Sequence, residues 1–143
     1  MNIQSAISLG TNILKKKFIQ TAQLDSEILM AKVIGGDRKY ILLNNYKNLT
    51  DNNLKYFKKL IKERALKKPI AYLTNKKFFW NYEFFITADT LIPRPDTELI
   101  IEEALKYLPI DKSKKILDIG TGSGCIVISL LKERPNCSAT ALD

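Results

Sequence analysis

The stretch that decides the fold is "KKILDIGTGSGCIVISLLKERPN", residues 114–136. Its short apolar run, 116–119, is flanked by lysines, which is the pattern of a buried parallel strand. A glycine-rich loop follows at 120–124, and an apolar helix is expected from about 125 to 134. A second strand is expected at 138–142. Strand, glycine loop, helix and strand in this order predict one right-handed βαβ unit.

The spacing of the glycines indicates which ligand the loop binds. A dinucleotide-binding loop has the pattern G-x-G-x-x-G, so its third glycine would fall at Cys125, whereas here the glycine is Gly124. The pattern G-x-G-x-G suits S-adenosylmethionine better than NAD. No Gly-Lys-Ser/Thr follows, which excludes a Walker phosphate loop. Glycines at these positions let the main chain approach a ligand closely and turn sharply into the helix.

An acidic residue follows the second strand. Asp143 lies 19 residues beyond Gly124, where a carboxylate can accept two hydrogen bonds from ribose hydroxyls. Asp118 has two possible roles: it orients the loop by accepting backbone N–H bonds, or it starts the turn. The candidate cofactor-binding residues are therefore Gly120, Thr121, Gly122, Ser123, Gly124 and Asp143.

A proline-stiffened stretch, "LIPRPDTELI", precedes this unit at residues 91–100. Pro93 and Pro95 fix their own φ angles and favour extended backbone at Arg94. Pro95, Asp96 and Glu98 suit the first turn of a helix, and Pro109 is expected to end that helix. From composition alone, a segment that holds Arg94 rigidly and a well-capped linker remain alternatives.

The first part of the chain has helical periodicity. Four helices are expected, near residues 3–18, 25–36, 37–46 and 50–68. Asp25 or Ser26 is expected to cap the second, and Thr50 or Asp51 the fourth. Residues 1–68 thus predict a small helical bundle without a catalytic group.

Aromatic residues dominate the segment that follows, "KKFFWNYEFFIT". It predicts a β-hairpin with strands Lys77–Trp80 and Glu83–Thr87. Its six aromatic side chains could form an exposed platform on which bases stack. Burial in a core or a domain boundary is favoured instead, because such side chains are usually buried.

Composition excludes several classes of protein. Apolar residues make up 45% of the 143, enough for a core, and no apolar run approaches the length of a membrane span. The absence of histidine removes His-based triads and most zinc catalysis, and no metal site is expected. Cys125 and Cys137 are too few for a disulfide framework, which favours reduced thiols and a cytoplasmic location.

The charge is unevenly distributed. Residues 1–90 contain 16 Lys or Arg against 7 Asp or Glu, and residues 91–143 contain 7 against 8. This asymmetry is typical of a protein that meets an acidic partner such as RNA or a ribosome-bound complex. A lysine-rich solvated surface accounts for it equally well.

Taken together, these motifs resemble the HemK-type glutamine-N5 methyltransferases, which methylate the glutamine of the GGQ motif in peptide-chain release factors. The similarity covers "KKPIAYLTNKKFFW", "LIPRPDTELI" and "ILDIGTGSGCIVISLL" running to "ALD". Asn75 stands where the family usually has glycine, and Asp96 where it often has glutamate. Neither departure disturbs the similarity, since asparagine tolerates a glycine turn position next best.

The resemblance implies a fold, a cofactor and a partner. We expect an α + α/β chain: a helical docking domain at 1–70, a hairpin and Pro-Arg-Pro linker at 71–95, and the start of a Rossmann-like domain at 96–143. S-adenosylmethionine would be the cofactor and a release factor the protein substrate, with RNA or the ribosome as further possible contacts of the basic region. The chain would act as a monomer, away from membranes. Arg94, Thr97 and Glu98 would line or brace the methyl-transfer pocket.

One feature of the family is missing. Its catalytic Asn-Pro-Pro-Tyr motif, which would position the glutamine amide, does not occur in these 143 residues, so no catalytic residue is expected here. We therefore expect the amino-terminal part of such an enzyme, whether a shortened chain, a split gene product or a degenerate remnant, and no activity from it alone.

Other readings of the sequence remain. Relatives that methylate a ribosomal-protein glutamine share much of the pattern, and adenine-N6 nucleic-acid methyltransferases share the cofactor unit. The Pro-Arg-Pro segment and the helical domain argue against the latter. A non-enzymatic basic module that docks on a release factor, RNA or a ribosome is the alternative function.

Overall fold

The computed structural model describes residues 1–143 and divides into two compact units, Met1–Thr74 and Asn75–Asp143. The first is helical and the second combines helices with two small sheets. The hairpin therefore belongs to the second unit, whereas the sequence suggested a separate linker at 71–95.

The first unit contains five helices: α1 (Ile3–Lys16), α2 (Ala22–Ile34), α3 (Arg38–Leu43), α4 (Asp51–Ala65) and α5 (Ile70–Thr74). The side chains of Asn2, Asp37 and Thr50 cap α1, α3 and α4 by accepting backbone N–H bonds. The helical prediction is confirmed, although α5 was not expected.

Two details of the helical prediction are wrong. Neither Asp25 nor Ser26 caps α2, which begins earlier, at Ala22. Ser26 instead donates to the carbonyl of Ala22, and Asp25 is buried inside the helix. The first helix was expected to reach residue 18, but Phe18 lies beyond the end of α1, at φ +55°, and is 90% exposed.

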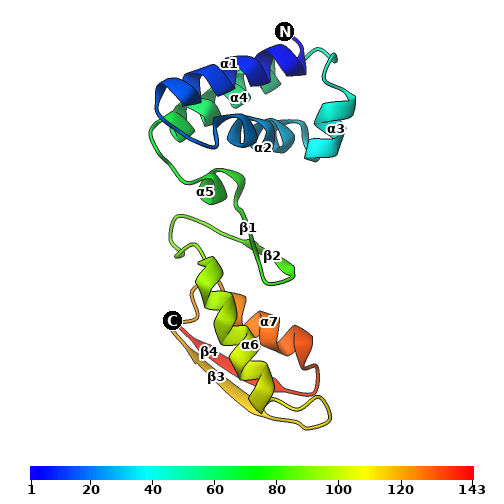
Figure 1. Cartoon of the computed structure of the whole chain (residues 1–143), viewed down its shortest axis with the longest axis vertical. Coiled ribbons are helices and arrows are strands. Elements are labelled where there is room, and N and C mark those ends of the chain that lie inside the picture. Colours follow the sequence, from blue (N-terminus) through cyan, green and yellow to red (C-terminus); the bar gives the residue numbers. More distant parts are fainter. The chain divides into compact units, whose positions relative to one another are not determined.

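The core of the first unit is closed. Helices α1, α2 and α4 pack together, as Figure 1 shows. With α3 they enclose side chains that are fully buried: Leu14, Leu29, Met30, Ile41, Phe57 and Ile61. Gly10 lets α1 lie close to α4, because a Cβ there would stand 2.8 Å from Cδ1 of Ile61. The unit thus buries its apolar face without help from another segment.

Buried charges in the first unit are paired. Arg64 on α4 donates to Asp25 at 2.7 Å, and Arg38 contacts Glu27 at 2.6 Å. Both carboxylates lie on α2 and are almost fully buried. An unpaired buried carboxylate would be strongly destabilising, so these pairs lock α2 to its neighbours.

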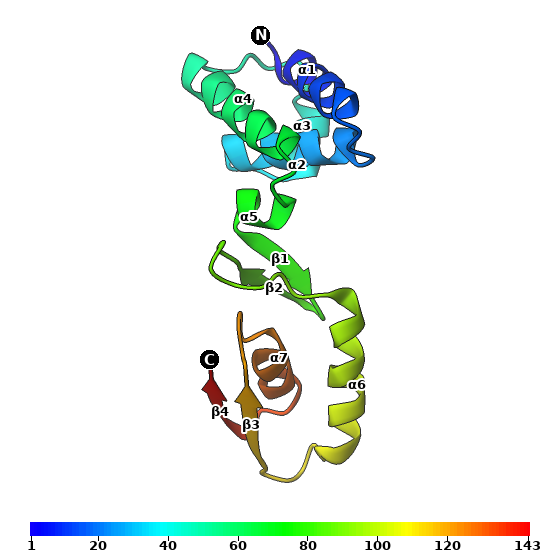
Figure 2. The same cartoon turned by 90° about the vertical axis from the view of Figure 1, so that its left-hand side faces the viewer.

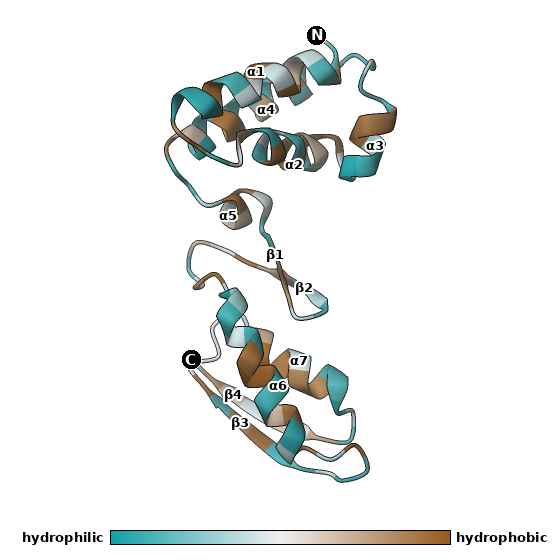
Figure 3. Ribbon diagram, viewed as in Figure 1, coloured by the Kyte–Doolittle hydropathy of each residue, from teal (hydrophilic) through white to brown (hydrophobic).

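The second unit contains, in order, β1 (Lys76–Phe79), β2 (Tyr82–Phe85), the short 3₁₀ helix η1 (Pro95–Thr97), α6 (Glu98–Tyr107), β3 (Lys115–Ile119), α7 (Cys125–Glu133) and β4 (Ser138–Leu142). Strands β1 and β2 form an antiparallel hairpin, and β3 and β4 pair in parallel with α7 between them in the chain. Figure 2 shows α7 between α6 and the parallel pair, and Figure 3 shows how apolar this helix is.

The parallel strands are more exposed than the sequence suggested. Leu117 is 60% exposed, Ile119 75% and Leu142 53%. Ile119 pairs with Leu142, and Leu117 lies two residues before Ile119, so the three share one face of the sheet. Helix α7 packs on this strand pair, yet these side chains remain open to solvent. The prediction of a buried strand is therefore wrong for the residues present, because nothing in the unit covers this apolar face.

The aromatic residues of the hairpin divide into two groups. Phe79 and Phe84 are buried and meet edge to face, whereas Phe78 and Phe85 are exposed. The preference for burial is thus correct for only part of the cluster. The turn lies at Trp80 and Asn81, one residue earlier than expected.

Candidate functional site

The glycine loop connects β3 to α7 and adopts an unusual backbone. Gly120, Gly122 and Gly124 have φ angles of +78°, +52° and +73°, in the left-handed region that side chains disfavour. The N–H groups of Gly120 and Thr121 donate to the carbonyl of Leu142 at 2.8 and 3.0 Å. The end of β4 thus fixes the start of the loop, and the glycines let it turn.

Asp118, near the end of β3, and Asp143, directly after β4, both contact the loop. Asp118 accepts a 2.8 Å hydrogen bond from the hydroxyl of Thr121, so it orients the loop through a side chain and not through a backbone N–H. Asp143 accepts from the N–H of Gly122 at 3.2 Å. The structure therefore brings together the loop and the acid that the sequence singled out 19 residues beyond Gly124.

The loop is open toward solvent. A Cβ built on Gly120 would meet no atom within 4 Å, and one built on Gly122 would meet only Cγ2 of Thr90, at 3.9 Å. Gly120 and Gly122 are therefore required by backbone conformation and not by close packing, whereas a Cβ on Gly124 would also stand 3.0 Å from Cδ1 of Ile128. The space above Gly120 and Gly122 fits the close approach of a ligand, because no protein atom fills it.

Thr90, the residue nearest to a Cβ built on Gly122, lies three residues before Pro93 in the chain. Arg94 precedes η1 with extended backbone, its carbonyl accepts from Thr97, and its side chain is exposed. Thr97 is half-buried at the junction with α6. The three residues proposed from the resemblance thus occupy one short stretch. Glu98 is the only one of them whose side chain forms a hydrogen bond there.

That partner identifies a bracing contact that sequence reasoning missed. Oε1 of Glu98 accepts the backbone N–H of Trp80 at 2.8 Å, at the hairpin turn where Trp80 has φ +55°. The indole Nε1 of Trp80 donates to Glu133 on α7, also at 2.8 Å. Two carboxylates from two helices therefore fix one strained turn residue. The only signal in the sequence was the chain's single tryptophan at the end of the first expected hairpin strand.

Tyr82 extends this contact. Its hydroxyl donates to Glu133 at 3.4 Å, and the ammonium of Lys132 lies 5.9 Å from its ring centre. Partial burial raises the pKa of Tyr82, and the negative charge of Glu133 raises it further. The phenol therefore stays protonated and available as a donor over the physiological range.

The glycine loop and the carboxylate of Asp143 meet at the end of a parallel strand pair, which is where ligands bind in such sheets. No group of three or more Cys, Asp or Glu side chains is arranged to hold a metal ion. None of the helices is long and apolar enough to cross a membrane.

Comparison with known proteins places the chain beside one group of enzymes. Residues 5–74 match the family described as the PrmC N-terminal domain. The release factor glutamine methyltransferase of Salmonella typhimurium is 45% identical over 119 residues, which is 83% of this chain and 43% of that protein. The enzyme of the same name from Buchnera aphidicola subsp. Acyrthosiphon pisum is 36% identical over the whole chain, and this covers 50% of that protein.

These matches confirm the resemblance drawn from the motifs. They extend from the helical unit through the glycine loop, because the Buchnera alignment includes all 143 residues. The chain spans about half the length of the curated relatives it matches.

Proposed function

We propose that this chain, a homologue of the amino-terminal half of release factor glutamine methyltransferases, is the docking and cofactor-binding part of an S-adenosylmethionine-dependent protein-glutamine N5-methyltransferase. Its substrate would be the GGQ glutamine of a peptide-chain release factor. The relatives' names state the release factor and the glutamine, and the loop geometry supports the cofactor.

The observation that carries this proposal is the meeting of the glycine loop with Asp143. Gly122 donates to one carboxylate oxygen of Asp143, which leaves the other oxygen for ribose hydroxyls. The open backbone at Gly120 and Gly122 would lie against the ligand, with Thr121 and Ser123 beside it. S-adenosylmethionine, when bound, would supply the sulfonium methyl group. Asp118 would keep the loop in shape through Thr121.

The open face of β3 and β4 supports a larger Rossmann-like domain. Parallel sheets are normally covered on both faces, and here Leu117, Ile119 and Leu142 are not. We propose that further strands and helices, corresponding to the rest of the relatives' length, cover this face and contribute the Asn-Pro-Pro-Tyr motif. Methyl transfer then belongs to the whole protein.

The remaining residues have supporting roles in this proposal. Glu98 braces the hairpin through Trp80, while Thr97 and Arg94 would stand at the edge of the methyl-transfer pocket. The exposed guanidinium of Arg94 is free to contact the substrate. The helical unit would hold the release factor while the glutamine is positioned, which converts binding energy into correct orientation. Both cysteines are free thiols, which suits a cytoplasmic protein.

The proposal is tested by methyl incorporation into a purified release factor. The 143-residue chain should transfer no labelled methyl group. The same chain joined to the remaining carboxyl-terminal part of the Salmonella enzyme should methylate the GGQ glutamine. Methylation by the chain alone would contradict the proposal, and so would a folded chimera that modifies another residue of the release factor.

A second function is favoured by one observation, the charge of the helical unit. Met1–Thr74 contains 14 Lys or Arg against 5 Asp or Glu. A non-enzymatic module that docks on RNA would show steep loss of affinity with salt, because phosphate contacts release counterions. Absence of RNA binding at low salt would remove this alternative.

A further inference from the structure

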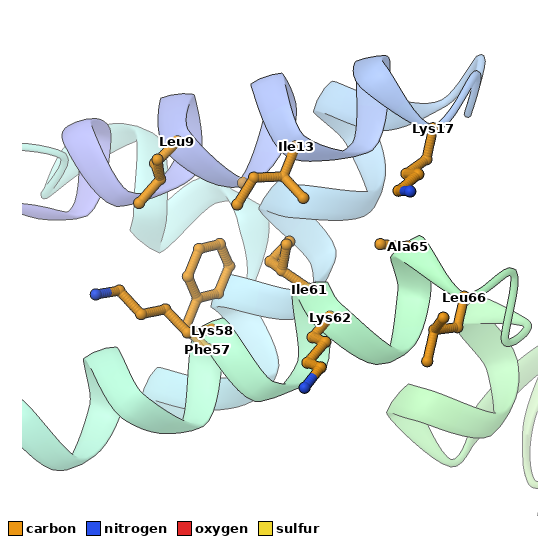
Figure 4. Close-up of a pocket in the computed structure, with 10 residues that line it drawn as sticks. Leu9, Ile13, Lys17, Phe57, Lys58, Ile61, Lys62, Ala65 and Leu66 are labelled. Carbon is orange, nitrogen blue, oxygen red and sulfur yellow. The ribbon is translucent and has the colours of Figure 1, made fainter.

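An apolar groove runs between α1 and α4 on the helical unit, and neither the glycine loop nor the Pro-Arg-Pro segment has a part in it. Its volume is about 390 Å³, and its apolar lining consists of Leu9, Ile13, Phe57, Ile61, Ala65 and Leu66. In Figure 4, Leu9 and Ile13 extend from α1 toward α4, and Phe57 and Ile61 extend toward them. The groove therefore has an apolar floor made by two neighbouring helices that run in the same direction.

The floor is buried and the edges are accessible. Phe57 and Ile61 are almost fully buried, whereas Leu9 and Ile13 are 38% and 37% exposed and Leu66 is 76% exposed. Gly10 also lines the groove, and the missing side chain there brings the two helices together. A partner that covered the edges would remove apolar surface from water without reshaping the core.

The rim of the groove is positively charged. Lys17, Lys58 and Lys62 line it, and none of them forms an ion pair with a carboxylate of the chain. All three are exposed. They lie in a unit with 14 basic against 5 acidic side chains. A second copy of this unit would bring like charges together, so self-association through the groove is disfavoured.

We infer that this groove is a docking site for an acidic amphipathic helix of a partner protein. Two packed helices with an apolar floor receive a helix whose apolar side chains recur at i, i+3 or i+4, and i+7. Carboxylates beside that apolar stripe meet Lys17, Lys58 and Lys62, which pair with nothing else. An RNA would use the lysines but not the floor, and a small apolar molecule would use the floor but not the lysines. The combination selects the helix.

The inference rests on the docking role proposed for the helical unit and deepens it, because it names the chemistry of the partner that the groove receives. Its test is fluorescence anisotropy of the 143-residue chain with a labelled designed peptide. The peptide has about 20 residues, long enough to be helical, with leucines in one stripe and glutamates on both sides of it. Two comparison peptides replace the leucines by serine or the glutamates by lysine.

The chain offers matched variants. Ile13→Asp should weaken binding of the acidic peptide roughly tenfold or more, because it places a charge in the apolar stripe. Leu66→Ser tests the same floor at a largely exposed position, where folding is not at stake. Lys58→Glu with Lys62→Glu should weaken binding about tenfold at low salt, and the effect should shrink as salt rises. The control is Lys39→Glu, at an exposed position of α3 outside the groove. It should change the affinity for the acidic peptide by less than about twofold.

Each outcome decides the matter. Binding of the acidic leucine peptide that is lost in the groove variants but kept in Lys39→Glu supports the inference. Equal binding of the serine peptide or the lysine peptide overturns it, as does a failure of the acidic peptide to bind. Three other results would also overturn the inference. An RNA could bind the Ile13→Asp variant as well as it binds the original chain, or a small apolar dye could occupy the groove while the peptide does not. The chain could also form a dimer that Ile13→Asp dissociates. S-adenosylmethionine binding should be the same in all these variants of the chimera, so the two proposals fail separately.

Discussion

The two units of the chain bury their apolar residues to very different extents. In Met1–Thr74, the helices enclose a core whose largest side chains are almost wholly buried, and the buried carboxylates are paired. In Asn75–Asp143, the parallel strands expose Leu117, Ile119 and Leu142 along one face. The helical unit encloses its core and leaves only a groove between α1 and α4 open, whereas the second unit leaves an apolar face of its parallel sheet uncovered. The difference separates a unit that closes its own core from one that leaves an apolar sheet face exposed, as the proposal of a larger cofactor-binding domain expects.

The largest expected effect tests the closed core. Leu29→Ala in α2 removes a side chain with no exposed surface and should lower the free energy of unfolding by about 2–5 kcal/mol. The same change at Leu24, which is 40% exposed on the same helix, should cost less than about 1 kcal/mol. Urea unfolding followed by helical ellipticity measures both. Equal costs would mean that α2 does not face the core as described.

The brace of the hairpin gives the next effect. Glu98→Ala leaves the half-buried N–H of Trp80 without its acceptor, which should cost about 1–2 kcal/mol in the second unit. Fluorescence of Trp80, the only tryptophan, reports this unit during unfolding. Glu98→Gln retains an acceptor oxygen and should restore most of the loss. Glu102→Ala, at an exposed position of α6, is the control. A loss in Glu102→Ala as large as in Glu98→Ala would point to helix propensity instead of the brace.

The open face of the sheet predicts a small effect that depends on context. Leu117→Ala should cost less than about 1 kcal/mol in this chain, because the side chain is 60% exposed. In the chimera that carries the rest of a relative, the same change should cost about 2–5 kcal/mol, since the face would then be covered. Tryptophan fluorescence during urea unfolding measures both. The same small cost in each protein would remove the argument for a larger sheet.

The smallest effect is a shift in titration. Burial and then Glu133 raise the pKa of Tyr82 above its ordinary value of 10.0. The folded state thus favours the protonated phenol, so this stabilisation is present below the ordinary pKa and is lost as pH rises through the raised one. Glu133→Gln should lower the pKa of Tyr82 without returning it to the ordinary value, because burial remains. NMR of ring-labelled tyrosine, assigned with Tyr82→Phe, follows the titration. No change in Glu133→Gln would contradict the contact.

Much of the architecture could be predicted because its signals are local. Capping at Thr50 and the apolar spacing of α4 lie within one segment, and so does the loop at Gly120, Gly122 and Gly124. Asn75 takes a left-handed φ of +60°, which agrees with the glycine that relatives were expected to have there.

The rest depends on contacts between distant residues. Asp25 looked like a helix cap because its partner, Arg64, lies 39 residues later. The brace of Trp80 by Glu98 and Glu133 spans 18 and 53 residues. Burial of Leu117 depends on what covers the strand, which an apolar run does not specify. The candidate site was predicted as a set of residues, but its shape required the strand pairing that places Asp143 beside Gly122.

The central claim, that the open glycine loop and Asp143 hold S-adenosylmethionine, is tested most directly by calorimetric titration of that cofactor into the chimera. We predict at least tenfold weaker binding for Gly122→Val, because a side chain would occupy the ligand's space at φ +52°. Asp143→Ala should weaken binding by a similar factor, and Gly36→Val in the helical unit should leave it unchanged. Unaltered affinity in both Gly122→Val and Asp143→Ala would contradict the account.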